Sequence, residues 1–467
     1  MGRLRDQYID KKYQTANVLT RARLAKYRNP VSLAGDYFRY PWFRATTNSN
    51  AIHKNLCQHR SGLYLEATAK TIHYVIKTTV DMLGASLSDP RKTVIHQEMI
   101  TPEIFSAMGL APFMAELLAV ALSLIDPHAA EEYIDISEDH NIPPDLCSHN
   151  KSTIGLALKD CFPPASALVS SNLPCDGGMS SYITMEKYLK IPSIKLDAPH
   201  NFYNDKAVAY FTGELRRMIT WLEKNTAGKM DWDKLKHICE QRNLMVEHEL
   251  ELWDMIRARP TPMASIPVTF SHLVAAAVLP GHERTAKLFK DIVSLAQKTI
   301  AAGQSALQNE KYRALLWNPP FQHAGDVFNW AEKAYGVALV MDSMTYSRRD
   351  PFVDTSSEES MLKSLGQNMM EGPMTRHTRG PAANYIEDVF RIVKQFDIDM
   401  LWVAGHVGCK NSAALNGMLR EKCRENNLPV LIINYDLSDP RVCSREGIME
   451  QINHFMENIM QAKRLDI

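Results

Sequence analysis

The segment Met400–Asn434, MLWVAGHVGCKNSAALNGMLREKCRENNLPVLIIN, decides the fold. It begins with an apolar run at 400–404 and ends with a second apolar run at 430–434. Between these runs, a glycine-containing loop leads into a helical pattern over 412–425. Two short apolar runs separated by a helix of this length are typical of a βαβ unit, in which the strands are parallel. The segment therefore predicts an α/β protein built on parallel sheet.

A similar arrangement lies earlier in the chain. A short apolar run at 165–170 (ASALVS) precedes a loop, a predicted helix around 182–189 and a strand-like segment at 191–197 (IPSIKLD). The segments 191–197 and 428–436 (LPVLIINYD) resemble each other, and each follows a strand, a cysteine-containing loop and a helix. This weak internal repeat predicts two α/β halves, with both cysteine loops at the carboxyl ends of parallel strands.

The first half begins with a β-branched run at 93–96. Thr101 and Pro102 then mark a helix start, because a hydroxyl residue followed by proline is favoured at the first helical position. The apolar residues Ile104, Met108 and Leu110 predict that this helix continues to about residue 110.

The remaining segments are mostly helical in pattern. Residues 1 to about 90 are polar and show no strand alternation. The stretch after residue 203 also lacks strand signals, and the pattern of alternating strands and helices resumes beyond residue 319. We therefore expect two parallel-sheet domains, a helical domain between or beside them, and an N-terminal helical extension. The expected divisions are 1–90 (extension), 91–202 (first sheet domain), 203–312 (helical domain) and 313–467 (second sheet domain).

Composition excludes several classes of protein. The 467 residues hold 53 Lys and Arg against 53 Asp and Glu, so the formal net charge of +0 lacks the basic surplus of a nucleic-acid or anionic-membrane binder. The longest apolar run, Leu117–Ile125, is shorter than the ~20 residues that a membrane span needs. The polar N-terminus has no apolar core typical of a secretory signal, so we expect a soluble cytoplasmic protein.

Eight cysteines are too few for a disulfide scaffold in a chain of this length, so we expect reduced thiols. Five of them lie in contexts that favour a structural role: Cys57, Cys161, Cys239, Cys423 and Cys443. The other three, Cys147, Cys175 and Cys409, each lie in a loop that leads into a predicted helix, which for Cys147 starts near Ser152. Helix N-termini favour anionic groups, including thiolates.

Several interpretations of these three cysteines remain open from spacing alone. Glycines at 177, 178, 405 and 408 would let the backbone approach a bulky inorganic group closely. However, no CxxC spacing indicates zinc or a ferredoxin-type cluster, and cysteines are commonly buried as small apolar residues. His149 and His406 could also complete a mixed Cys/His zinc site.

Three stretches together are similar to the 2-hydroxyacyl-CoA dehydratase family, which also contains subunits of ATP-dependent benzoyl-CoA reductase. They are PDLCSHNKSTIG, ALVSSNLPCDGGMSSYITMEKYLKIPSIKLDAPHN and IDMLWVAGHVGCKNSAALNGMLREKCRENNLPVLIINYDLSDPR. The ordered set of cysteine, asparagine, histidine and aspartate positions is specific as a set, although each piece is weak. The resemblance covers roughly Lys92 to the C-terminus.

The resemblance implies two Rossmann-like domains with a helical part, and a [4Fe-4S] cluster held by Cys147, Cys175 and Cys409, with one iron left open. It implies an acyl-CoA substrate, a second family subunit and an ATP-hydrolysing iron–sulfur activator. In this family, one electron enters the thioester carbonyl, and the resulting ketyl radical anion expels the 2-hydroxyl as hydroxide. The position that resembles the family's active-site carboxylate is Glu116, although a solvated helix glutamate is an equal alternative.

The sequence differs from the family pattern at one position, and more than one function within the family remains open. Active dehydratase subunits carry a serine upstream of that carboxylate, where this chain has Glu98-Met99. The first expectation is an iron–sulfur subunit of a 2-hydroxyacyl-CoA dehydratase. The alternatives are a subunit of an aryl-CoA reductase and a non-catalytic subunit that only relays electrons.

Overall fold

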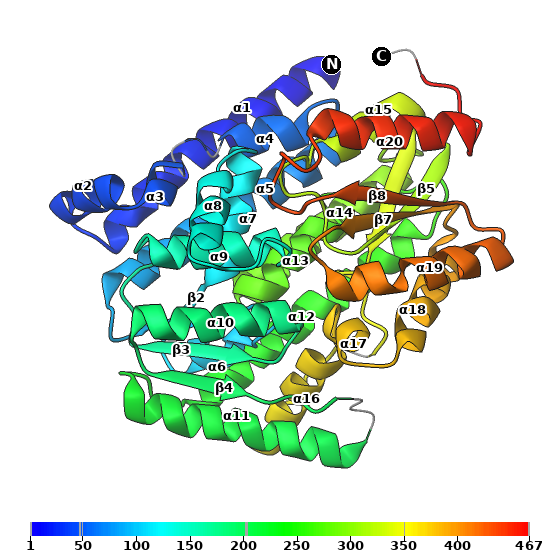
Figure 1. Ribbon diagram of the computed structural model, residues 1–467. Coiled ribbons are helices and arrows are strands. Elements are labelled where there is room, and N and C mark those ends of the chain that lie inside the picture. Colours follow the sequence, from blue (N-terminus) through cyan, green and yellow to red (C-terminus); the bar gives the residue numbers. More distant parts are fainter. Residues whose placement is uncertain (1, 46–47, 49, 201–203, 350, 466–467) are drawn as a thin grey trace.

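The computed structural model describes residues 2–45, 48, 50–200, 204–349 and 351–465, and it contains two four-stranded sheets whose strand pairs are all parallel (Figure 1). The first sheet has the order β2-β1-β3-β4 and the second the order β6-β5-β7-β8. The first sheet is formed by Thr93–His96 (β1), Ala111–Met114 (β2), Ala167–Ser171 (β3) and Ser193–Leu196 (β4). The second is formed by Tyr312–Trp317 (β5), Val337–Asp342 (β6), Met400–His406 (β7) and Val430–Tyr435 (β8). The shared order confirms the two predicted parallel-sheet halves, and the repeated segments fall on β4 and β8.

Strand β7 shows why an uninterrupted apolar run forms a parallel strand. Leu401 and Val403 pack in the same core as helix α18 (Ala382–Phe396), whereas Trp402 and Ala404 pack on the opposite face with α20 (Arg445–Asn458). Both faces of the strand are therefore buried, so no position favours a polar side chain. Figure 1 shows α20 on one side of β7 and β8, and α19 (Lys410–Glu425) on the other.

The first sheet is covered in the same way. Leu168 of β3 packs with Tyr182 and Met185 of α10 (Asp176–Leu189), whereas its neighbour Val169 packs on the other face with α11 (Asp205–Asn225). Figure 1 shows these two helices on opposite sides of β3 and β4. Parallel strands joined by crossover helices require this double cover.

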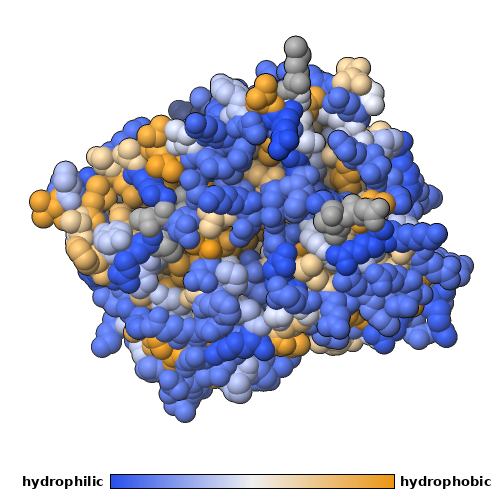
Figure 2. Space-filling view, turned by 90° about the horizontal axis from the view of Figure 1, so that it is seen from above, coloured by the Kyte–Doolittle hydropathy of each residue, from blue (hydrophilic) through white to orange (hydrophobic). Residues whose placement is uncertain are grey.

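Apart from short connections, the described part of the first ninety residues is helical, as predicted. They form α1 (Gly2–Thr20), a 3₁₀ helix (Arg21–Lys26), α2 (Pro30–Arg39), α3 (Pro41–Ala45), α4 (Asn50–Cys57) and α5 (Gly62–Ser88). The long helix α5 contacts α1 on one side and α14 on another, so it joins this extension to the rest of the molecule. Figure 2 shows apolar side chains gathered at the left edge, where α2 lies in Figure 1. The exposed apolar side chains of α1 and α2 include Leu4, Tyr8, Val31 and Phe38.

Helices also account for the segment between the two sheets, and no strand forms among its described residues. They are α11, α12 (Trp232–Ile256), α13 (Thr269–Val278) and α14 (Glu283–Ala301). Helix α11 contacts β4 and α16 (Glu358–Glu371), whereas α12 contacts α6 (Pro102–Ala107) and α14. The division of the chain into domains at residues 90, 202 and 312 stays a prediction. None of the helices in the described part of the chain is long and apolar enough to cross a membrane.

The helix predicted to reach residue 110 is shorter than expected. Helix α6 ends at Ala107, and Gly109 adopts a φ of 71°, a left-handed conformation that ends helices and favours glycine. The edge strand β2 follows directly and was not predicted, because it contains Pro112. Proline cannot donate to a sheet ladder but is tolerated on an edge strand.

Strand β5 was also not predicted, because it contains an arginine. Arg313 is fully buried and forms a 2.9 Å ion pair with Glu310. Its guanidinium also donates to backbone carbonyls at the ends of two helices, including Ile256 and Phe396. These acceptors satisfy a charge that is rarely buried.

The helices that follow the loops of Cys147 and Cys175 begin earlier than the sequence predicts. Helix α9 (Ser148–Leu158) begins directly after Cys147 rather than near residue 152, and α10 begins directly after Cys175 rather than around residue 182. The other helices are α7 (Ala115–Ile125), α8 (Glu131–Asp139), α15 (Val327–Tyr335) and α17 (Thr375–Thr378).

A buried ion pair connects the N-terminal helices to the second sheet, and it gives a test of the fold. Glu332 of α15 accepts from Arg60 at 2.9 Å, from Tyr64 at 2.8 Å and from Ser265 at 2.6 Å. Glu332→Ala should lower the free energy of unfolding by about 3–5 kcal/mol, because it leaves Arg60 as an uncompensated buried charge. Glu425→Ala, which breaks the exposed pair with Lys422, should cost at most about 1 kcal/mol. Equal losses in denaturant titrations of the two variants would contradict this account.

Candidate functional site

Loops at the carboxyl ends of all eight strands line one cavity of about 800 Å³. Parallel strands bring their carboxyl ends to one edge of a sheet, which is where α/β proteins bind ligands. The cavity therefore lies between the two sheet edges at which the strands end. At or just after the strands of the first sheet, the lining includes Glu98, Glu116, Cys175 and His200. In the second sheet, the corresponding residues are Asn318, Asp342, Cys409 and Leu437.

Each of the three predicted cysteines lines this cavity and occupies the N-cap of a helix. Cys147 caps α9, Cys175 caps α10 and Cys409 caps α19. The backbone N–H of Gly178 donates to the sulfur of Cys175 at 3.4 Å. Unpaired N–H groups and the helix dipole make such positions favourable for a negatively charged sulfur.

The loops that carry the cysteines approach one another closely. A Cβ placed on Gly408 would lie 2.7 Å from the Cα of Cys147, and one placed on Gly177 would lie 2.8 Å from Nδ2 of Asn150. Any larger residue at 408 would therefore push the Cys147 and Cys409 loops apart. The two glycines allow three separate parts of the sequence to approach one another closely.

The surroundings of the three cysteines determine their charge. Burial raises the pKa of each thiol, to about 11 for Cys175. Negative charge on Cys175 and on Cys409 raises the pKa of Cys147 further, which indicates that the sulfurs lie within electrostatic range. Three thiolates in this cavity therefore need a positively charged group among them, and without one the cysteines keep their protons.

Two histidines lie beside the cysteines, but His406 is placed as a hydrogen-bond donor. The backbone N–H of Leu437 donates to its Nδ1 at 3.1 Å, so the ring proton is on Nε2. Nε2 lies 3.1 Å from the sulfur of Cys147 and donates to it, which leaves no lone pair there for a metal. His149 is buried, and its Nδ1 has no hydrogen-bond partner among the described residues. Burial and the charge of His406 lower the pKa of His149 to about 4.

The five cysteines predicted to be structural do not line the cavity. Cys57, Cys161, Cys239 and Cys423 are buried elsewhere, and Cys443 is half-buried. Among the described residues, no three His, Cys, Asp or Glu side chains converge closely enough to hold one metal ion directly. Which cysteines bind a metal group thus stays a prediction.

Glu116 is buried in the first turn of α7 rather than solvated. Its Oε2 lies 2.7 Å from the hydroxyl of Tyr182, which also lies 2.8 Å from the carbonyl oxygen of His96. A tyrosine has one proton to donate, and a carbonyl oxygen can only accept. That proton serves one oxygen at a time, and when Tyr182 donates to Oε2 the hydrogen bond acts against the raised pKa of Glu116.

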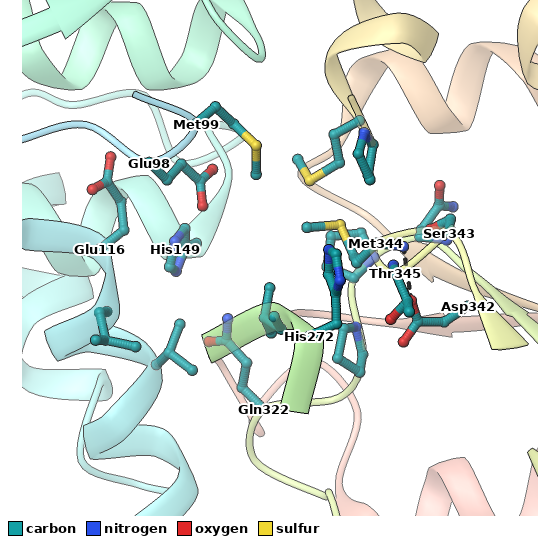
Figure 3. Close-up of a pocket in the computed structure, with 18 of the residues that line it drawn as sticks. Glu98, Met99, Glu116, His149, His272, Gln322, Asp342, Ser343, Met344 and Thr345 are labelled. Carbon is teal, nitrogen blue, oxygen red and sulfur yellow. Dashed lines mark hydrogen bonds between the residues drawn. The ribbon is translucent and has the colours of Figure 1, made fainter. Parts of the chain in front are cut away.

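Glu98 lies beside Glu116 on the same wall, together with His149 (Figure 3). Burial raises the pKa of Glu98, and burial together with the charge of Glu98 raises that of Glu116. Two neighbouring carboxyls in an apolar site resist double ionisation, so at least one stays protonated at neutral pH. Sequence reasoning noted Glu98 only as a departure from a family pattern.

The opposite wall carries a polar group that sequence reasoning missed. His272 of α13 faces the cavity in Figure 3, with Asp342 at the end of β6 behind it. Nδ1 of His272 lies 2.6 Å from Oε1 of the buried Glu249 of α12. Asp342 accepts from the backbone N–H groups of Met344 and Thr345 at 2.8 and 2.6 Å. Helical periodicity gives no signal for such pairs, because they join separate helices.

Comparison with known proteins adds two findings. A family model described as 2-hydroxyglutaryl-CoA dehydratase, D-component, matches residues 99–459. The lactoyl-CoA dehydratase subunit alpha of Anaerotignum propionicum is 23% identical over 396 residues, which cover 77% of this chain and 90% of that subunit. The family match includes cavity-lining residues from both sheets and leaves the N-terminal helices, strand β1 and Glu98 outside.

The protonated state of Glu116 gives a test by stability. A raised pKa means that folded Glu116 binds its proton more tightly than unfolded Glu116. Its stabilising contribution is therefore complete below the ordinary carboxyl range and is lost as pH rises through the raised value. Glu116→Gln keeps a neutral side chain at all pH values. The free energy of unfolding of the wild type should fall relative to that of the variant as pH rises from about 5 to about 9. A constant difference in denaturant titrations across this range would show that Glu116 is ionised in the folded chain.

Proposed function

Because the chain belongs to the 2-hydroxyglutaryl-CoA dehydratase D-component family, we propose that it is the iron–sulfur subunit of an enzyme that removes water from a 2-hydroxyacyl-CoA. The observation that supports this most is the meeting of three cysteine-capped helices at one cavity that also holds a buried carboxyl pair. We also propose that the two covered sheets are Rossmann-like domains.

The donor set fits a [4Fe-4S] cluster held by Cys147, Cys175 and Cys409. A cubane spreads its irons over separate corners, so its thiolate ligands need not converge on one point. The cationic irons would supply the positive charge that the three thiols lack, and the helix N-termini favour the negative sulfurs. A bound cluster would supply the electron that makes the substrate's 2-hydroxyl a leaving group.

The chain's own residues provide the acid chemistry. Glu116 is held neutral by burial and by the charge of Glu98, and it lines the same cavity as the cysteines. We assign it as the general acid that protonates the departing 2-hydroxyl, so that water rather than hydroxide leaves. Tyr182 positions this carboxyl through the 2.7 Å contact of its hydroxyl with Oε2, which leaves Oε1 for the proton that is given to substrate.

Two partners complete the proposed enzyme. The relative in Anaerotignum propionicum is named a subunit alpha, which supports a second, unlike subunit for this chain. Apolar side chains exposed on α1 and α2 are the kind of surface that a subunit covers. An ATP-hydrolysing iron–sulfur protein would provide the electron. Both comparisons name dehydratases, so we favour dehydration over the alternative of aryl-CoA reduction.

The ligand assignment is tested by iron content. Cys147→Ala, Cys175→Ala and Cys409→Ala should each lose most of the iron and acid-labile sulfide of anaerobically purified protein. Cys239→Ala and Cys423→Ala should keep both, because their thiols are buried away from the cavity. A full complement of iron in any of the first three variants would show that its cysteine is not a ligand.

The reaction is tested with the reconstituted enzyme, which contains the partner subunit and the activator. Lactoyl-CoA and 2-hydroxyglutaryl-CoA are the first substrates to assay, with formation of the 2-enoyl-CoA as the readout. Glu116→Gln should lower kcat by about 10²–10⁴-fold, because it removes the acid. Glu132→Gln, on the exposed side of α8, should not change kcat. Absence of enoyl product with the wild type across a panel of 2-hydroxyacyl-CoA thioesters would refute the proposed function.

A further inference from the structure

The wall opposite Glu98 and Glu116 contains a histidine that is oriented by a buried carboxylate (Figure 3). The contact of 2.6 Å joins Nδ1 of His272 to Oε1 of Glu249, and the two residues come from different helices, α13 and α12. The side chain of Glu249 is only 4% exposed and that of His272 15%. Both residues line the cavity.

This contact determines which nitrogen of His272 is available. A carboxylate can only accept, so Nδ1 carries the proton that Glu249 holds. In the neutral ring, Nε2 then has a free lone pair. Because Nδ1 is engaged with Glu249 and the ring lines the cavity, Nε2 is the nitrogen that a bound molecule would meet. A buried carboxylate that fixes an imidazole in this way is the arrangement by which enzymes orient a histidine base.

Charged groups around His272 and its burial have opposing effects on its pKa. Glu249 and Arg242 of α12 and Asp342 at the end of β6 act on the ring. Burial lowers the pKa of His272, but the charge and hydrogen bond of Glu249 outweigh it and raise the pKa above the ordinary value. A raised pKa makes the neutral imidazole a stronger base for proton transfer.

The proposed dehydration needs a base as well as an acid. Elimination breaks the bond from carbon 2 to the hydroxyl oxygen and the bond from carbon 3 to its hydrogen, and it forms the double bond between these carbons. Glu116 is protonated and therefore occupied as the acid. Glu98 shares its wall, and burial disfavours the ionised form that Glu98 would need in order to act as a base.

We propose that His272 is the general base of the reaction and that Glu249 is its positioning residue. Nε2 takes the proton from carbon 3 while Glu116, across the cavity, gives a proton to the leaving oxygen. The products are the 2-enoyl-CoA and water. The electron that the activator supplies returns after each turnover, so the elimination is redox-neutral. This inference rests on the proposed function.

The surface of the chain offers a matched control for the dyad. His128 contacts Glu131 through the same atoms, Nδ1 and Oε1, at the same distance of 2.6 Å. However, the side chain of His128 is 71% exposed, and it does not line the cavity. His128→Gln therefore removes an equivalent His–Glu contact that has no access to substrate.

The test combines turnover of the reconstituted enzyme with chemical labelling of the histidines. His272→Gln should lower kcat by about 10²–10⁴-fold while the affinity for the substrate thioester is kept, whereas His128→Gln should change neither. Diethylpyrocarbonate, which acylates unprotonated imidazole, should label His272 with a midpoint that Glu249→Gln shifts to lower pH. A saturated acyl-CoA should protect His272 but not His128 from this labelling.

The outcomes separate the two proposals. Turnover of His272→Gln within a few-fold of the wild type, or labelling of His272 that acyl-CoA does not prevent, would overturn the role of His272 and leave the proposed function intact. Loss of turnover together with loss of substrate affinity would show that His272 is only structural, and would also overturn the inference. No turnover with the wild type would refute the proposed function and, with it, the assignment of a base.

Discussion

The parallel direction of the strands is the constraint on which the rest of the structure depends. Each sheet delivers the carboxyl ends of its four strands to one edge, and both edges border the same cavity. Residues as distant in sequence as Glu98 and Cys409 can meet there only because crossover helices return the chain to the same edge each time. These crossovers also place a helix N-terminus behind Cys175 and Cys409, so the topology that positions the cysteines also stabilises negative charge on them.

Burial determines the protonation of the ionisable groups in the cavity. The same low-dielectric surroundings raise the pKa of the three thiols and of Glu98 and Glu116, so in the absence of a cation these groups favour their protonated forms. A cationic cluster would reverse this preference for the thiols while leaving the acid protonated. On the other wall, the negative charge of Glu249 raises the pKa of His272, which makes its neutral imidazole a stronger base. Acidic and basic groups thus face each other across one apolar space.

The sequence predicted the parts of the fold that are regular and missed those that depend on context. The runs 400–404 and 430–434 were found because β7 and β8 consist mostly of apolar residues. Strands β2 and β5 were missed because Pro112 and Arg313 contradict strand patterns, and only the edge position and the helix-end carbonyls explain them. The position of Cys147, Cys175 and Cys409 before helices could be predicted because thiols before helices are chemically distinctive, whereas their role as ligands stays a prediction. Tyr182, Glu249 and His272 were not, because their contacts join residues that no periodicity relates.

The most direct test of the account is the content of iron, acid-labile sulfide and zinc in the wild-type chain purified without oxygen, together with its visible spectrum. The account predicts about four iron and four sulfide per chain and a broad absorbance at the blue end of the spectrum. Such a result would mean that the chain holds a single cubane. Zinc alone, or no metal in anaerobic protein, would contradict the cluster and leave only the fold and the family.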